Sequence, residues 1–247
     1  MISRLMLFAL VTAITTACSG PPSPTTPTPA APPTESPAPV PSPVPVPLPD
    51  PVARYVVTVQ STWSEQTHPT DWPDSAHYSP LIGGTHSSGV TFWQDGRPAT
   101  EGIRAMSERG RTSPLDLEVM AAITAGTAQN LLSGPDLRTS PDSASMEFDI
   151  SVGFPLVTLV TMVAPSPDWF VGVSGLSLLV NNQWSDGQTI VLYPWDAGTD
   201  SGITYKAEDL RTLPAEPIQR LLGFPVAVNG TVPPFGTMTF RRLVVTR

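Results

Sequence analysis

The chain is 247 residues long, carries a formal net charge of −8 and contains one cysteine. Fifteen of its 31 prolines fall between Pro21 and Pro51, which leaves residues 52–247 as one domain with enough apolar and aromatic residues to pack a core. Binding to a phosphate backbone needs a basic surface, and Lys206 is the single lysine, so we expect no nucleic-acid partner.

Residues 1–17 have the form of an export signal. A positively charged start, residues 1–4, precedes a mainly apolar run, residues 5–14, that is too short to span a bilayer. The cysteine that follows, Cys18, makes the segment similar to the lipobox of bacterial lipoproteins, although Thr15 stands where leucine is usual. We expect lipidation at Cys18 and attachment to a bacterial cell membrane or outer membrane, with the domain outside the cytoplasm. An ordinary signal peptide is the alternative.

Residues 18–51 form a proline-rich segment of low complexity. Proline at every second or third position excludes a helix and favours polyproline II, which rises about 3.1 Å per residue. The composition indicates a stiff spacer between anchor and domain, and an unstructured tail is the alternative.

From residue 52 onward the pattern is typical of short β-strands. β-Branched and alternating runs predict strands at residues 54–59, 145–150, 156–163, 169–173, 176–180, 189–193 and 237–246. Helices are predicted only at residues 100–109 and 113–132, the second with Ser113 as N-cap and Pro114 at its first position. We therefore expect an all-β fold, an antiparallel β-sandwich with one or two inserted short helices.

Two loops carry the densest group of candidate ligands. The motifs PSPDWFVGV and YPWDAGTDSG place Asp168, Asp196 and Asp200 beside strands, and Gly198 permits a tight turn between the last two. Three carboxylates at one end of a sandwich suit calcium, a hard cation that takes about six to eight oxygen ligands. Backbone carbonyls and water would supply the rest. The alternative is that each aspartate only caps its own turn.

These motifs, together with AHYSPLI, GTH and PFGT, resemble the spondin domain of the F-spondin and mindin family, from about residue 53 to residue 246. The resemblance implies an antiparallel β-sandwich of a C2-like variant. It also implies a calcium ion held by Asp168, Asp196 and Asp200. Two departures stand out: the domain lacks the cysteine pairs of animal members, and it offers no basic cluster for glycosaminoglycans.

The histidines give a weaker signal. His68, His77 and His86 are nine residues apart, and with Asp71 or Asp74 they could form a zinc site. Because none has the HxH or HxxxH spacing, we expect each to have a structural role.

The tryptophans have two interpretations. Trp169 and Trp195 flank the candidate ligands and could form a platform for a sugar or lipid headgroup. The alternative is a core position, which strand alternation favours for Trp63 and Trp93.

The combined expectation is an exported, membrane-anchored, calcium-binding spondin-domain lipoprotein that mediates adhesion or recognition of an extracellular protein, glycan or lipid headgroup. No G-x-S-x-G, H-E-x-x-H or phosphate-loop motif is present, so we expect no enzyme. The alternatives are a metal-assisted extracytoplasmic hydrolase and a purely structural envelope protein.

Overall fold

The computed structural model of the protein describes residues 49–244. The expected signal peptide at residues 1–17, the lipidation site Cys18 and nearly all of the stalk at residues 18–51 lie outside the described residues. Among the residues described, no helix has the length and apolar character needed to cross a membrane.

The first of two main sheets has four antiparallel strands in the order β10-β13-β1-β5. Its strands are β1 (Val52–Ser61), β5 (Ser143–Ser151), β10 (Gly187–Leu192) and β13 (Gly236–Leu243). Successive side chains of a strand point to opposite faces, so Tyr55, Val57 and Val59 enter the core while Arg54 and Gln60 stay in solvent. This sheet therefore has one buried and one exposed face.

The second main sheet has seven strands, ordered β12-β11-β7-β6-β3-β4, with β2 paired to β6. Its strands are β2 (His77–Tyr78), β3 (Ile82–His86), β4 (Ala128–Ser133), β6 (Leu156–Ala164), β7 (Trp169–Ser177), β11 (Trp195–Asp196) and β12 (Gln219–Arg220). A separate two-stranded hairpin consists of β8 (Leu179–Val180) and β9 (Gln183–Trp184). The expected antiparallel sandwich is confirmed.

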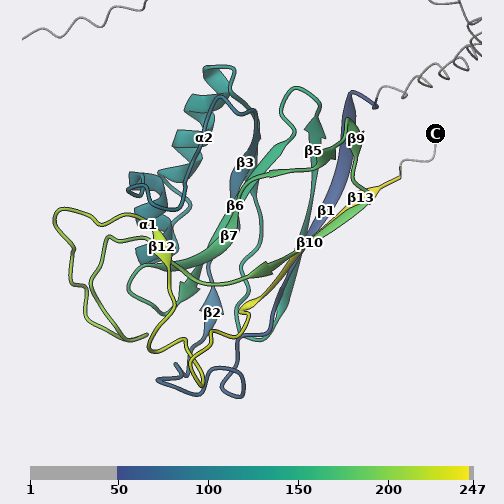
Figure 1. Ribbon diagram of the computed structural model, residues 1–247. Helices are drawn as coiled ribbons and strands as arrows, with labels where there is room; N and C mark the ends of the chain where they lie inside the picture. Colours follow the sequence, from purple (N-terminus) through teal and green to yellow (C-terminus); the bar gives the residue numbers. More distant parts are fainter. Residues whose placement is uncertain (1–48, 245–247) are drawn as a thin grey trace, which may run out of the picture. The chain divides into compact units, whose positions relative to one another are not determined.

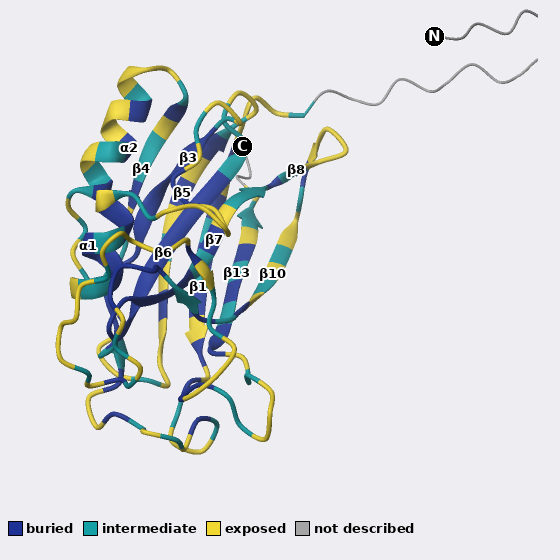
Figure 2. Ribbon diagram, turned by 60° about the vertical axis from the view of Figure 1, so that its left-hand side comes forward, coloured by how far each residue is buried: buried dark blue, intermediate teal, exposed yellow. Residues whose placement is uncertain are grey.

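Helices α1 (Glu101–Arg109) and α2 (Leu115–Thr124) lie against the second sheet, on its side away from the first (Figure 1). One hydrophobic cluster fills the space between the sheets, and a second joins the helices to the strands, where Ile103 and Val119 lie in the same cluster as Val160. Because β6 is covered on both faces, it is almost continuously apolar and buried (Figure 2).

A carboxylate from α2 helps to cap α1. Thr100 accepts a hydrogen bond from the N–H of Ile103 at 3.1 Å and donates its own hydroxyl to Glu118 at 2.7 Å. The other oxygen of Glu118 accepts from the N–H of Gly102 at 2.7 Å. Two otherwise unpaired groups at the start of α1 are thereby satisfied from the neighbouring helix.

Two predicted elements are wrong in extent. The helix predicted at residues 113–132 ends at Thr124, because the chain turns at Gly126 (φ 73°) and continues as β4. Pro114 occupies the N-cap position without a side-chain cap, so Ser113 is not the cap. The strand predicted at residues 176–180 is broken at Leu178, which separates β7 from β8. The other predicted strands are confirmed with shifted ends.

Strand β3 has no clear strand pattern in the sequence, because Gly83 and Gly84 have low strand preference. They lie inside the second sheet, paired to β4 and β6. A Cβ atom on Gly83 would lie 2.0 Å from the carbonyl oxygen of Thr158. The glycine thus permits a close approach of two strands.

Candidate functional site

The three aspartates are brought together where β7 pairs with β11. Asp168 ends the turn between β6 and β7, and Asp196 stands opposite Trp169 in the β7–β11 ladder. The N–H of Ala197 donates to the carbonyl of Asp168 at 3.2 Å, which extends the contact by one residue. Asp200 follows in the loop after β11, so all three belong to one end of the second sheet.

Asp168 is fully buried and organises the loop after β11. Its Oδ2 accepts hydrogen bonds from the N–H of Thr199 at 2.7 Å, the hydroxyl of Thr199 at 3.2 Å and the N–H of Asp200 at 3.0 Å. Its Oδ1 is buried and has no hydrogen-bond partner among the described residues. A buried carboxylate oxygen without a partner is energetically costly unless a cation or a proton compensates it.

The other two aspartates cap turns. Asp196 Oδ1 accepts from the N–H of Gly198 at 2.7 Å, and Asp200 Oδ1 accepts from the N–H of Gly202 at 2.8 Å. The Oδ2 of Asp200 accepts from the N–H of Leu210 at 2.8 Å. The turn-capping alternative therefore describes real contacts of Asp196 and Asp200, but it leaves the free oxygen of Asp168 unexplained.

Gly198 is required by the tight turn between Asp196 and Asp200. Its φ is 72°, and a Cβ atom there would lie 2.2 Å from the carbonyl oxygen of Glu216. The N–H of Glu216 donates back to the carbonyl of Gly198 at 2.8 Å. The positive φ and the close backbone contact explain why position 198 is a glycine.

The electrostatics of the cluster disfavour the ionised forms of Asp168 and Asp196. Burial, and after it the charge of Asp196, raises the pKa of Asp168 to about 7, although hydrogen bonds from Thr199 and Asp200 oppose the shift. Burial also raises the pKa of Asp196, as do the charges of Glu216 and Asp200. A bound cation would remove the repulsion that raises both pKa values.

The donor set suits a hard cation in chemistry but is not arranged as a ready-made cage. Within residues 49–244, no three His, Cys, Asp or Glu side chains gather closely enough to hold a metal ion. The oxygens least used by the protein are Oδ1 of Asp168 and Oδ2 of Asp196, while both oxygens of Asp200 are hydrogen-bonded to backbone. Calcium ligation by these carboxylates would need backbone carbonyls and water to complete it.

The histidines make separate structural contacts. Buried His68 donates Nε2 to the carbonyl of Pro233 at 3.2 Å, and His77 bonds the carbonyl of Ser75 at 2.6 Å. His86 accepts at Nε2 from the hydroxyl of Thr158 at 2.8 Å. Burial lowers the pKa of His68 and His86, so both favour the neutral form.

The two tryptophans beside the aspartates differ in exposure. Trp169 is buried in the sandwich core, where its ring lies 5.1 Å from that of Tyr205, so the platform interpretation is wrong for it. Trp195 is only half-buried. Arg220 stacks on it, 4.6 Å from the ring centroid, and on Tyr193 at 4.8 Å. The sequence analysis missed Arg220. No local sequence pattern predicts this arginine, because the two rings that it contacts are far from it along the chain.

Comparisons with known proteins identify the family of this domain. The Spondin_N family model matches residues 53–226. The chain belongs to the spondin N-terminal domain family. This spondin domain is 37% identical to Spondin-1 of Mus musculus over 180 residues, which are 68% of the chain and 22% of the relative. It is 33% identical to Spondin-2 of Homo sapiens over 174 residues, 69% of the chain and 53% of the relative.

The similarity covers only part of each relative. Spondin-2 of Rattus norvegicus is 31% identical over 205 residues, and the match spans 62% of that protein. The chain therefore spans about a fifth of Spondin-1 and about half of human Spondin-2. The family match ends before β13, yet β13 lies between β1 and β10 in the first sheet of this spondin domain.

Proposed function

We propose that the chain is an exported, membrane-anchored, calcium-binding recognition protein without enzymatic activity. Its spondin domain would bind an extracellular protein, glycan or lipid headgroup near the loops of Asp168, Asp196 and Asp200. Membership of the spondin family supports export and a recognition role. The sequence of residues 1–17 supports export independently.

Anchoring is proposed at Cys18, ahead of the proline-rich segment. Two or more acyl chains give a stable membrane attachment, whereas one alone is marginal at ~0.8 kcal/mol per buried CH₂. The test is mass spectrometry of the protein expressed in a bacterial host. We expect a lipid adduct on Cys18 in the native sequence and none after Cys18→Ser; an unmodified native protein would remove the anchor from the proposal.

The observation that carries the calcium proposal is the buried, unpartnered Oδ1 of Asp168 beside the carboxylate of Asp196. Calcium would be held by Asp168, Asp196 and Asp200 with backbone carbonyls and water. Its charge would offset the repulsion of the carboxylates and order the loop after β11. A partner could then meet either the ordered loop or the ion itself.

The calcium experiment is thermal unfolding in EGTA, in about 10 mM calcium and in about 10 mM magnesium. Extracellular calcium modules bind at ~10⁻⁴–10⁻³ M, and saturation at about 100 times the dissociation constant adds ~2.7 kcal/mol. For a domain of this size that is a rise in Tm of roughly 5–10 °C. Magnesium should give a clearly smaller rise.

Two variants assign the ligands. Asp196→Asn should abolish the rise in calcium while the domain stays folded. The control is Asp74→Asn, whose side chain is 94% exposed and pairs only with Lys206 at 3.3 Å, and it should keep the full rise. Equal calcium responses in wild type and Asp196→Asn would overturn the ligand assignment.

A further inference from the structure

The sandwich is closed along one side and open along the other. On the closed side, Asn130 of β4 donates to the carbonyl of Asp149 in β5 at 2.9 Å, and Ser151 donates to Gln129 at 2.6 Å. On the opposite side lie β10, the edge strand of the first sheet, and the part of β7 beyond β11. They are joined at one end, where the side chain of Gln188 in β10 donates to the carbonyl of Ser177 at 2.8 Å, and they are not paired as strands along the rest of this side. Strand β11 pairs with β7 only at Trp169 and Phe170 and then departs.

The departure of β11 leaves a free edge on β7. The carbonyl of Asp168 accepts a hydrogen bond from the N–H of Ala197. The N–H and C=O groups of every second residue after Asp168 therefore point toward the same side of β7, the side on which β11 lies. Beyond the end of β11, these residues are Gly172 and Ser174. No strand of the described part of the chain pairs with this side of either residue. Two N–H and two C=O groups are therefore available to a further strand.

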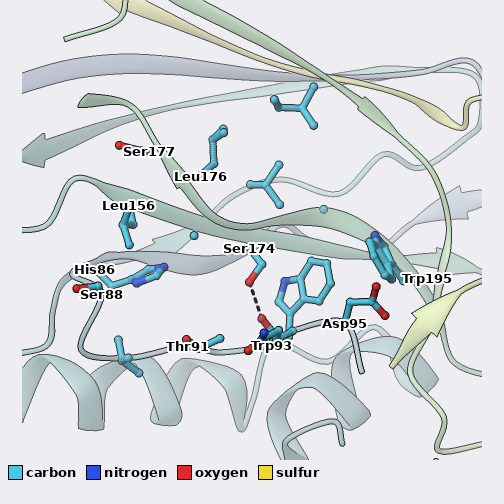
Figure 3. A pocket seen from close by; sticks show the side chains of 16 residues that line it. His86, Ser88, Thr91, Trp93, Asp95, Leu156, Ser174, Leu176, Ser177 and Trp195 are labelled. Carbon is cyan, nitrogen blue, oxygen red and sulfur yellow. Dashed lines mark hydrogen bonds between the residues drawn. The ribbon is translucent and has the colours of Figure 1, made fainter. Parts of the chain in front are cut away.

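A cleft of about 770 Å³ runs along this free edge. Figure 3 shows Trp93, Trp195 and Asp95 at one end of the cleft and Leu176 toward the other. The rings of Trp93 and Trp195 are 5.1 Å apart, and Ile190 of β10 contributes to the lining. The volume lies in the range of ligand sites, and the walls offer apolar contacts on both sides of the strand edge.

The charge of the cleft selects against anions. Asp95 is exposed and is the one formally charged side chain among the described residues that line it; none of them is lysine or arginine. His86, also in the lining, has both ring nitrogens engaged, with the carbonyl of Ser87 at 2.8 Å and the hydroxyl of Thr158 at 2.8 Å. Arg220, which stacks on Trp195, lies near enough to Asp95 for their opposite charges to interact, so it offsets part of the negative charge at that end of the cleft. With the net charge of −8, the lining still favours a basic group on the ligand.

We propose that this cleft binds an extended peptide of a partner protein, which adds as a strand to the free edge of β7 and places a basic side chain beside Asp95. Main-chain hydrogen bonds to Gly172 and Ser174 would supply affinity, and alternate apolar side chains would contact Trp195 and Ile190. The added strand would cover the open side of the sandwich. None of the three aspartates lines the cleft, so the proposal is tested in EDTA.

The probe is a phage-displayed library of random twelve-residue peptides, selected on the purified full chain in EDTA. We expect enriched sequences with alternating apolar residues and at least one lysine or arginine. A synthetic copy should lose at least tenfold in affinity when its alternate amides are N-methylated, because N-methylation removes strand hydrogen bonds. A library that yields no enriched peptide would overturn the proposal, as would N-methylation without effect.

Four variants locate the site on the protein. Ser174→Pro removes an N–H from the free edge of β7, where proline is tolerated, and it also removes the hydroxyl that donates to the carbonyl of Trp93. Ser174→Ala removes only the hydroxyl, so Ser174→Pro should bind the peptide at least tenfold more weakly than Ser174→Ala. The matched control, Thr189→Pro on the edge strand β10, should bind normally. Asp95→Lys changes an exposed charge and should reverse the preference from basic to acidic peptides, which remains informative if Ser174→Pro fails to fold.

Three results would contradict this assignment. If binding were lost in Thr189→Pro but kept in Ser174→Pro, the peptide would pair with the edge of β10 and not with that of β7. If Asp95→Lys left the affinity for basic peptides unchanged, the argument that Asp95 selects a basic side chain would be wrong. Saturable binding of neutral oligosaccharides that displace the selected peptide would identify the cleft as a glycan site instead.

Discussion

Asp168 should make the metal-free domain less stable as the pH rises. The pKa of its carboxyl is raised from 3.8 to about 7 in the folded protein. Between these two values the folded state holds a proton that the unfolded state releases, so this contribution to stability is present at low pH and is lost as the pH approaches 7. Replacing the carboxylate in Asp168→Asn removes the titration and keeps an acceptor for Thr199 and the N–H of Asp200.

The size of the effect follows from the shift in pKa. A shift of about 3 units at ~1.36 kcal/mol per unit makes ionised Asp168 unfavourable by about 4 kcal/mol above pH 7. At pH 5 the same calculation gives about 1.7 kcal/mol. The stability difference between Asp168→Asn and wild type should therefore widen by about 2.5 kcal/mol from pH 5 to pH 8, or roughly 5–10 °C in Tm.

The assay is urea unfolding of both proteins at pH 5 and pH 8 in EDTA, with Asp74→Asn as the control. Asp74→Asn serves as the control because it removes a carboxylate outside the aspartate cluster, on a side chain that is 94% exposed. In calcium, the wild type should recover most of the stability that it loses at pH 8. If the free energies of unfolding of Asp168→Asn and wild type changed equally with pH, the argument that ionisation of Asp168 destabilises the folded domain would be refuted.

Three further predictions concern capping, the tight turn and pH. Glu118→Ala removes the acceptor for two polar groups at the start of α1 and should cost about 1–3 kcal/mol in urea unfolding; a loss below about 0.5 kcal/mol would contradict the capping role. Gly198→Ala, at a φ of 72°, should lower Tm in EDTA and abolish the calcium response; an unchanged Tm would argue against the strain. Since the pKa of His86 is lowered, the unfolded state takes up a proton first as the pH falls below about 6.5. In the Asp168→Asn background, the change in urea stability from pH 7 to pH 5 should therefore be less unfavourable with His86→Asn than without it; identical profiles would contradict the role of His86.

Local pattern was sufficient to predict most of the β-structure. Alternation in β1 and the apolar run of β6 indicated strands, because a strand that is half buried alternates and one that is covered on both faces does not. The same reasoning extended α2 too far, since residues 128–133 are apolar enough for either element and only pairing with β3 makes them a strand. It also missed β3, whose Gly83 has low strand preference and is placed by close contact with Thr158.

The sequence by itself determined the family, the sandwich class and the loops in which the candidate ligands lie, because these depend on residue type and spacing along the chain. Tertiary structure decided which oxygen of Asp168 is left without a partner and that Trp169 is buried while Trp195 is not. It also decided that β7 keeps a free edge beyond β11. Burial and unpaired main-chain groups depend on which distant segments pack together, and no local pattern of residues encodes that.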